Sequence, residues 1–344
     1  MTRPDTMRAV TATDGAVTMG SRPVPQPGRD EILIRVVAAG INRADLAQRQ
    51  GRHAPPPGAS DVLGLEVSGI VEAVGPEDPL DIGPASRIPA PQPGDRVCAL
   101  LAGGGYADYV IASRQCVLPV PGDLDMVEAA ALPEAAFTVW DNMVTRGELD
   151  IPKAVLVHAG ASGVGTLALQ LARTLDCRIF ATAGTEAKRA ACVSLGAERA
   201  FDYRTEDWAA EINAQCGGAD IVLDLVGASH LAKNLEVMAP EGRLITIGFV
   251  GGATADLDMR AVARKRLTLT GSLLRGRNAV QKSAIAEAVY AGLWPKIARR
   301  EIEPIIHTTF ALEDVDQAHT LLAGDSVIGK LVLEVDRALC TADV

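Results

Sequence analysis

The chain has 344 residues, which predicts two domains at about 100–200 residues per domain. It carries 33 Lys and Arg residues against 43 Asp and Glu residues, so its formal net charge of −10 repels nucleic-acid phosphates and anionic lipids. Aromatic residues make up only 3% of the sequence, and hydrophobic residues make up 48%. This composition disfavours a nucleic-acid-binding or membrane-surface protein and favours a soluble enzyme with tightly packed α/β layers.

The cysteines and the hydropathy pattern indicate a reducing compartment. The six cysteines form no C-x-x-C pair and do not cluster with histidine, which is typical of isolated thiols. No segment reaches about 18 uninterrupted apolar residues, and residues 1–7 are polar, unlike a secretion signal. We therefore expect a cytoplasmic protein that neither crosses nor binds a membrane.

The first third of the chain has the pattern of a mainly β domain. Between residues 8 and 125, short apolar segments rich in β-branched residues are separated by glycine and proline turns. The expected strands are residues 31–39, 63–74, 96–101 and 106–111.

From about residue 126, apolar strands alternate with helical patterns. The expected strands are residues 154–158, 178–182, 200–202, 221–225, 243–247 and 267–271, and the expected helices are 164–175, 186–195, 207–215 and 230–238. Six strands with helices between them predict a doubly wound parallel sheet. A further helix at 279–300 and a strand at 329–335 are expected to pack against the first part.

A glycine-rich turn joins the first of these strands to its helix. Gly160 suits a tight turn, and Gly163 and Gly165 allow a pyrophosphate and the neighbouring strand to approach the backbone closely. Ser162 stands where this kind of turn has its second glycine, and its hydroxyl can donate a hydrogen bond. A turn without a ligand is the alternative, but the strand–turn–helix context favours a dinucleotide site.

The end of the next strand distinguishes between two dinucleotides. Gly184 stands where an NAD site carries an acidic residue, and Thr185, Lys188 and Tyr203 are suited to hold the 2′-phosphate of NADP. Glu186 weakens this prediction because its carboxylate is close in sequence. The alternative is that Lys188 is an ordinary surface charge.

Several segments carry a resemblance to a known family. They are residues 40–58, beginning Gly-Ile-Asn-Arg-Ala-Asp, the Leu-Gly-Leu-Glu-Val-Ser-Gly segment at 63–69, Pro-Glu-Ala at 133–135, residues 248–252, Ser-Leu-Leu-Arg at 272–275 and Ile-Gly-Lys at 328–330. With the glycine turn, they resemble the zinc-independent quinone oxidoreductase branch of the medium-chain dehydrogenase/reductase superfamily. The p53-inducible type is the most similar, and the resemblance spans residues 7–335.

The resemblance implies an architecture and an activity. A GroES-like catalytic domain would comprise residues 1–126 and 275–344, and a Rossmann domain at 127–274 would bind NADPH. Substrates would be quinones, enones or other conjugated carbonyl compounds. The residues implied to contact the cofactor are Asn42, Thr138, Gly160, Ser162, Gly163, Val164, Gly165, Gly184, Thr185, Lys188, Tyr203, Gly227, Phe249, Val250, Ser272, Leu273, Leu274 and Lys330.

Zinc-dependent relatives carry cysteine and histidine ligands in these same segments. Here Asn42 and Leu65 stand at two of those positions, and Cys98 is the only cysteine between residues 75 and 111. We therefore expect neither a catalytic nor a structural zinc ion.

Three polar residues are the candidates for catalysis: Asn42, Asp45 and His53. His53 stands where many quinone oxidoreductases have a tyrosine, and a histidine can donate a proton near neutral pH. The alternatives are that His53 is a loop residue held by the prolines at 55–57 and that Asp45 starts a helix in a capping box. His158, within an apolar strand, is expected to be a core histidine.

The last Rossmann strand also predicts an oligomer. Residues 266–271 form an edge strand without proline, which could pair with its own copy across a two-fold axis. The resemblance implies the same homodimer, and a monomer whose edge is covered by residues 275–278 is the alternative.

Two other functions remain open from the sequence. One is an enoyl or alkenal double-bond reductase on the same fold, which fold-level similarity cannot distinguish from a quinone reductase. The other is a non-catalytic NADPH-binding protein with a structural or redox-sensing role.

Overall fold

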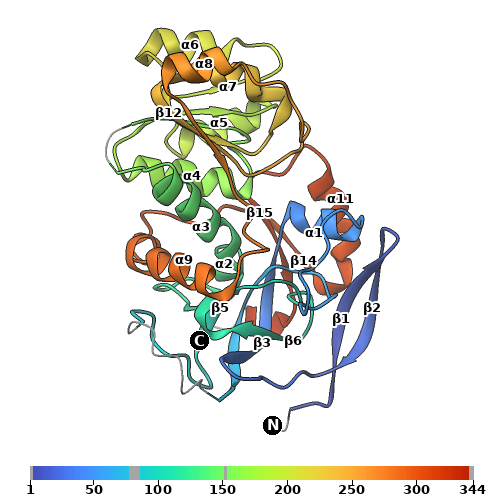
Figure 1. Cartoon of the computed structure of the whole chain (residues 1–344). Coiled ribbons are helices and arrows are strands. Elements are labelled where there is room, and N and C mark those ends of the chain that lie inside the picture. The colour runs from blue at the N-terminus through green and yellow to red at the C-terminus, as the bar shows by residue number, and fades with distance from the viewer. Residues whose placement is uncertain (1–2, 77–85, 151–152, 341–344) are drawn as a thin grey trace. The chain divides into compact units, whose positions relative to one another are not determined.

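The computed structural model describes residues 3–76, 86–150 and 153–340. The chain divides into two compact units (Figure 1). Unit 1 comprises Met1–Phe137, Leu274–Arg300 and Ile306–Val344, and unit 2 comprises Thr138–Leu273 and Glu301–Ile305. Residues 127–137, which we had expected to begin the Rossmann domain, group with unit 1 in this division.

Unit 1 is built on a seven-stranded sheet in the order β14–β15–β3–β4–β5–β7, with β6 also paired to β3. The last strand of the chain, β15, pairs antiparallel with β3, which confirms that the closing strand packs against the first part. The strands are β3 (Glu31–Ile41), β4 (Glu66–Val74), β5 (Arg96–Leu100), β6 (Tyr109–Ser113), β7 (Val117–Pro119), β14 (Ile306–Ala311) and β15 (Lys330–Glu334).

A separate hairpin and several short helices complete unit 1. The hairpin pairs β1 (Thr6–Thr13) with β2 (Ala16–Pro23). The single helix expected at 279–300 is two helices, because Pro295 lacks the backbone N–H that a continuing helix would need. The helices are α1 (Arg43–Arg49), α2 (Met126–Ala130), α3 (Pro133–Val139), α9 (Ala279–Gly292), α10 (Trp294–Ala298), α11 (Val315–Ala323) and α12 (Arg337–Cys340).

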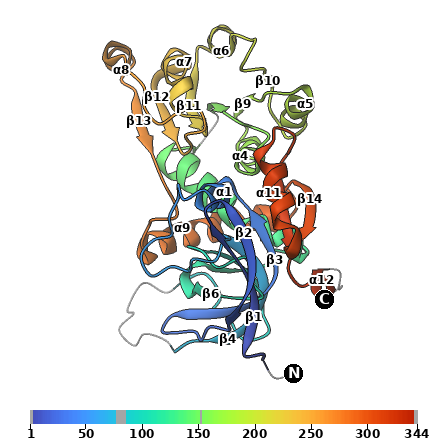
Figure 2. The same ribbon diagram turned by 90° about the vertical axis from the view of Figure 1, so that its right-hand side faces the viewer.

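Unit 2 contains a six-stranded parallel sheet in the order β10–β9–β8–β11–β12–β13 (Figure 2). In chain order these are strands 3-2-1-4-5-6, which confirms the predicted Rossmann arrangement. The strands are β8 (Ala154–Val157), β9 (Arg178–Thr182), β10 (Arg199–Phe201), β11 (Ala219–Asp224), β12 (Met238–Thr246) and β13 (Thr268–Gly271).

The helices of unit 2 alternate with these strands and cover an apolar core. They are α4 (Gly163–Arg173), α5 (Glu186–Ser194), α6 (Trp208–Cys216), α7 (Leu231–Val237) and α8 (Met259–Lys265), preceded by a π-helix at Trp140–Arg146. Leu156, Phe180, Val222 and Leu244 extend from four neighbouring strands of the sheet into one buried cluster, which also contains Trp208 of α6. Among the described residues, no helix combines the length and apolar character needed to span a bilayer.

Candidate functional site

The turn between β8 and α4 leaves no room for side chains. A Cβ at Gly165 would lie 2.5 Å from the carbonyl oxygen of Ala159, and a Cβ at Gly160 would lie 2.8 Å from the Cβ of Ala181. Ser162 caps the helix, because its Oγ accepts the Gly165 N–H at 3.0 Å. Its hydroxyl hydrogen stays available to a ligand. The remaining N–H groups of the first turn, at Gly163 and Val164, make the end of an eleven-residue helix suitable for a phosphate.

The Arg204 side chain lies over Gly184. The Nη1 of Arg204 donates to the Gly184 carbonyl at 2.8 Å, and a Cβ at Gly184 would lie 2.9 Å from Nη2. The guanidinium carbon also lies 5.0 Å from the centre of the Tyr203 ring. Sequence reasoning identified Gly184 and Tyr203 but missed Arg204, although its place two residues after the predicted third strand was a usable signal.

Two further predicted residues begin the neighbouring helix α5. Thr185 is the N-cap, and its Oγ1 accepts the Lys188 N–H at 3.3 Å. Arg189 forms an ion pair with Asp202 at 3.1 Å. Gly184, Thr185, Lys188, Tyr203 and Arg204 are therefore grouped at the ends of β9 and β10, where a cation-rich site can hold a phosphate.

The ends of the next strands carry the other predicted cofactor residues of unit 2. Gly227 follows β11 with φ +88°, and a Cβ there would lie 2.7 Å from the carbonyl oxygen of Gly252. Phe249 and Val250 follow β12 with 49% and 67% of their surface exposed, and Leu273 follows β13 with 58% exposed. Large exposed apolar side chains at strand ends suit contact with a ligand.

A directed chain of hydrogen bonds lies beneath these strand ends. Asp224 accepts the Gly227 N–H at 3.0 Å and the Asn234 Nδ2–H at 3.1 Å. The Asn234 Oδ1 then accepts from His158 Nε2 at 2.7 Å, and His158 Nδ1 accepts from the Thr182 hydroxyl at 2.9 Å. Because the carboxylate can only accept, it fixes the Asn234 amide and places the proton on His158 Nε2, and a neutral imidazole then accepts at Nδ1.

His158 is therefore the core histidine that the sequence predicted. It is fully buried, and burial lowers its pKa to about 4. The chain it belongs to connects Thr182 of β9 with the Gly227 turn after β11.

The burial of His158 predicts a pH-dependent stability. Between pH 4 and 6.5 the unfolded chain binds a proton at this residue and the folded chain does not, so folding becomes more favourable as the pH rises. Over this range, the titration of His158 raises the free energy of unfolding by about 3 kcal/mol. In urea unfolding across this range, His158→Gln should reduce the rise in the free energy of unfolding, whereas the control His307→Gln, at an exposed position, should not. An unchanged slope in His158→Gln would contradict the assignment.

In unit 1, three predicted or adjacent residues form a buried polar cluster. Lys330 donates from Nζ to Asn42 Oδ1 at 2.7 Å and also forms an ion pair with Glu66. Asn42 Nδ2 donates to Glu66 Oε1 at 2.9 Å, and the Glu134 N–H donates to Glu66 Oε2 at 2.9 Å. Sequence reasoning did not select Glu66, although a carboxylate within an apolar strand was a signal for a buried partner.

Asp45 lies beside this cluster and is fully buried. Its oxygens accept the Asn42 N–H at 2.7 Å, the Gly64 N–H at 3.2 Å and the Tyr106 hydroxyl at 3.1 Å. Burial raises the pKa of Asp45 to about 6. Both oxygens are used within unit 1, which supports the capping interpretation over a catalytic role.

Glu134 and His53 of unit 1 also have shifted pKa values. Burial, followed by the nearby Glu66, raises the pKa of the half-buried Glu134 to about 7. Burial and the neighbouring Arg275 lower the pKa of His53. Arg275 also holds the His53 segment in place, because its guanidinium donates to the carbonyls of His53 (2.8 Å) and Ala102 (2.9 Å) and to Gln48 Oε1 (2.6 Å).

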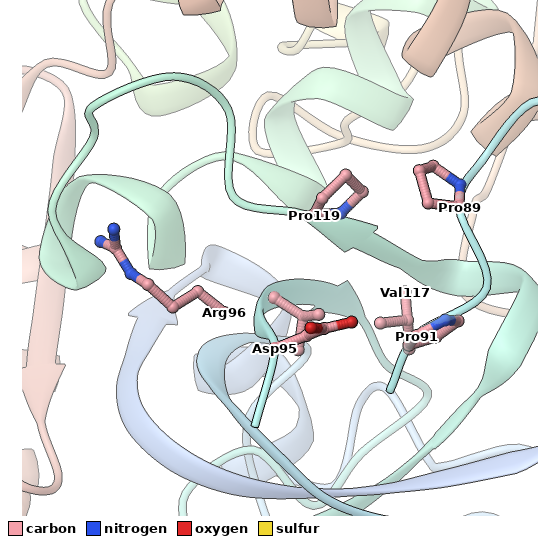
Figure 3. A pocket seen from close by; sticks show the side chains of 7 residues that line it. Pro89, Pro91, Asp95, Arg96, Val117 and Pro119 are labelled. Carbon is pink, nitrogen blue, oxygen red and sulfur yellow. The ribbon is translucent and has the colours of Figure 1, made fainter. Parts of the chain in front are cut away.

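A cavity of about 240 Å³ in unit 1 lies apart from these residues (Figure 3). Its lining consists mainly of Pro89, Pro91, Pro119 and valine side chains. Arg96 lines it too, but its Nη2 donates to the Leu124 carbonyl at 2.8 Å. The volume is below the range of about 300–1,000 Å³ that is usual for small-molecule sites.

The described residues also contain no group of three or more His, Cys, Asp or Glu side chains placed to hold a metal ion.

Comparisons with known proteins place these features in a family. Residues 28–122 match the alcohol dehydrogenase GroES-like domain, and residues 163–289 match the zinc-binding dehydrogenase family. The chain is 30% identical to a quinone oxidoreductase from Lama guanicoe over 317 residues, covering 90% of both chains, and 29% identical to the one from Homo sapiens over 90% of this chain and 91% of that one. The chain belongs to the quinone oxidoreductases of the medium-chain dehydrogenase/reductase superfamily.

Solved structures of related proteins agree with this assignment. Escherichia coli quinone oxidoreductase, solved in complex with NADPH, superposes with a TM-score of 0.82 at 25% identity over 96% of this chain and all of that one. A mycobacterial protein complexed with NADPH gives a TM-score of 0.84 at 29% identity with the same coverage. The comparisons confirm the predicted family and its GroES-like and Rossmann folds, so the protein is an oxidoreductase of this superfamily.

One further match extends beyond the single-chain quinone oxidoreductases. The chain is 30% identical over 313 residues to a phenolphthiocerol/phthiocerol polyketide synthase from Mycobacterium tuberculosis. The match covers 90% of this chain but only 14% of the synthase polypeptide, so the whole fold recurs as one part of a much larger enzyme.

Proposed function

We propose that this oxidoreductase transfers a hydride from NADPH to quinones or related conjugated carbonyl compounds and does so without zinc. The observation that carries the proposal is the grouping of Lys188, Tyr203 and Arg204 around Gly184 at the end of β9. An NAD-specific site needs an acidic residue there, whereas a 2′-phosphate needs a small residue and nearby cations.

The residues of unit 2 fit this cofactor. The turn at Gly160 and Gly165 is too tight for side chains, so the backbone itself can meet a pyrophosphate at the start of α4. The Arg204 guanidinium occupies the space that a side chain at position 184 would fill, which leaves its charge at the expected position of the ribose phosphate. When bound, NADPH would supply the hydride, so the chain itself needs only to bind, orient and exclude water.

The polar cluster of unit 1 supports a zinc-free reaction. Asn42 stands at a ligand position of zinc-dependent relatives, and the Lys330 ammonium already bonds Asn42 Oδ1 and Glu66. A zinc ion at the same oxygens would have to displace this buried cation. In our proposal Lys330 and Asn42 contribute to the cofactor site from within unit 1.

The proton that follows the hydride does not require a strong acid from the chain. His53 has a lowered pKa, so it is mainly neutral at pH 7 and is a weak proton donor there. We propose that His53 lines the substrate site and that water can supply the proton to a quinone, which is already activated toward hydride.

Reduction of an enoyl or alkenal double bond is the second candidate function. The match to the polyketide synthase favours it, because the same fold operates there within an enzyme that makes a polyketide. A non-catalytic NADPH-binding protein, by contrast, predicts cofactor binding without turnover of any acceptor.

An acceptor panel tests the proposed reaction. We expect NADPH oxidation with a higher kcat/KM for quinones than for 2-alkenals or enoyl thioesters, and we expect turnover to survive prolonged chelation because no step uses zinc. The measurement is absorbance at the reduced-nicotinamide band, with semiquinone detection by electron paramagnetic resonance. Higher kcat/KM for the alkenes would favour the second candidate, and loss of activity that added zinc restores would overturn the zinc-free proposal.

The preference for NADPH over NADH can be tested at the two proposed phosphate-binding cations. A charge-assisted hydrogen bond contributes about 1.5–3 kcal/mol, so Lys188→Ala and Arg204→Ala should each weaken NADPH binding about 10- to 150-fold and leave NADH binding nearly unchanged. Arg264→Ala is the control, because Arg264 is an exposed cation on α8. Titration of cofactor fluorescence measures both dissociation constants. Equal losses for the two cofactors would contradict the phosphate assignment.

We also propose a homodimer through β13, which pairs only with β12 among the described strands. The Ser272 N–H donates to the carbonyl of Thr246 in β12. Successive residues of a strand direct their N–H groups to opposite sides, so Leu269, an odd number of residues before Ser272, directs its N–H to the open edge. Two such edges can pair antiparallel across a two-fold axis.

Sedimentation equilibrium tests this dimer. The wild-type mass should be about twice the 36.0 kDa of one chain. Leu269→Pro removes an outward N–H and should give a monomer that still binds NADPH, whereas Leu269→Val should remain dimeric. A wild-type mass near that of one chain would contradict the proposal.

A further inference from the structure

A π-helix of unit 2 carries a buried asparagine that contacts the residue directly after β13. It covers Trp140–Arg146, directly after α3, and its wider turn is closed where the Gly147 N–H donates to the Asn142 carbonyl at 2.9 Å. Single π-turns are rare and occur frequently at functional sites. Asn142, in this π-helix, is only 2% exposed although its side chain is polar.

Both polar atoms of the Asn142 side chain are hydrogen bonded. Nδ2 donates to the Thr138 carbonyl at 2.8 Å, and Oδ1 accepts the Ser272 hydroxyl at 2.7 Å. The orientation of the amide is fixed, because the Thr138 carbonyl can only accept and therefore must face the NH₂ group. Asn142 thus joins Thr138, in the last turn of α3, to Ser272, the first residue after β13.

The contact between Asn142 and Ser272 lies in the half of the Rossmann sheet that binds the nicotinamide part of a dinucleotide. Strands β8–β10 carry the glycine turn and the proposed phosphate cations, and β11–β13 form the second mononucleotide-binding half. Ligands bind outside the carboxyl ends of such strands, and Ser272 follows the carboxyl end of β13 directly. Ser272 is therefore at the half that receives the nicotinamide nucleotide, and the Asn142 side chain links the Thr138 carbonyl to it.

We infer that Asn142 is a positioning residue that orients Ser272 and Thr138 toward the nicotinamide half of the cofactor. This inference rests on the proposed NADPH-dependent function. The Ser272 hydroxyl hydrogen is committed to Asn142, so its oxygen faces a ligand only as an acceptor, which suits the N–H groups of a carboxamide. Asn142 itself is buried and contacts no ligand.

No other common side chain reproduces this bridge. Aspartate has the same shape but no N–H, so its carboxylate would face the Thr138 carbonyl oxygen and would lose one hydrogen bond. The Ser272 hydroxyl could still donate to that carboxylate. Asn142→Asp therefore changes the contact with Thr138, and Ser272→Ala removes the other contact.

The experiment compares the whole cofactor with a fragment that lacks the nicotinamide half. Dissociation constants of NADPH and of adenosine 2′,5′-bisphosphate are measured by calorimetry for the wild type and for Asn142→Asp, Ser272→Ala and the double variant, together with thermal unfolding. We expect each single variant to bind NADPH about 5- to 20-fold more weakly and the bisphosphate as tightly as the wild type. The double variant should lose less than the product of the two effects, because both act through one contact. Asn213→Asp is the matched amide-to-acid control in the same unit.

The outcomes distinguish this inference from the proposed function. Wild-type protein that binds neither NADPH nor the bisphosphate would overturn both. Wild-type protein that binds NADPH, with variants that bind it equally well or lose both ligands in parallel, would overturn the positioning role alone. Should Asn142→Asp fail to fold, Ser272→Ala still gives the comparison, because Ser272 is partly exposed and its replacement opens no large cavity.

Discussion

The close approach of α4 to the end of β8 is the constraint on which unit 2 depends. Side chains at Gly160 and Gly165 would collide with the backbone and with the neighbouring strand β9, so the turn has only one arrangement. β8 lies between β9 and β11, where the strand order reverses. The same turn directs free N–H groups outward, so the packing requirement and the phosphate-binding capacity have one cause.

Buried hydrogen-bond networks hold the loops at the strand ends in place. His158 connects Thr182 to Asn234 and through Asp224 to the Gly227 turn, while Asn142 connects Thr138 to Ser272. In each network the acceptor-only groups fix which way the amides and the imidazole point. Unsatisfied buried polar groups cost about 1–3 kcal/mol each, so such networks hold loops that would otherwise be mobile.

In unit 1, a buried network that includes an ion pair holds distant segments together. The Lys330 ammonium is nearly fully buried between Asn42 and Glu66, and Glu66 also accepts a backbone N–H from α3. Removal of one partner from a buried ion pair leaves an uncompensated charge, which is strongly destabilising. This cluster joins residues from the start, the middle and the end of the chain, and it accounts for the polar residues at 42, 66 and 330 without a metal ion.

The sequence by itself determined the alternation of six strands with helices, the glycine turn and the mixed architecture, because apolar periodicity and glycine punctuation are local signals. It did not predict the β1–β2 hairpin, whose second strand is largely exposed and has no alternating apolar pattern, nor β14 and α11. Only the tertiary structure placed Arg204 over Gly184, Glu66 against Lys330 and Asn142 between Thr138 and Ser272. These partners are up to 264 residues apart, and a contact between distant residues depends on how the strands are ordered in space, which local propensity does not encode.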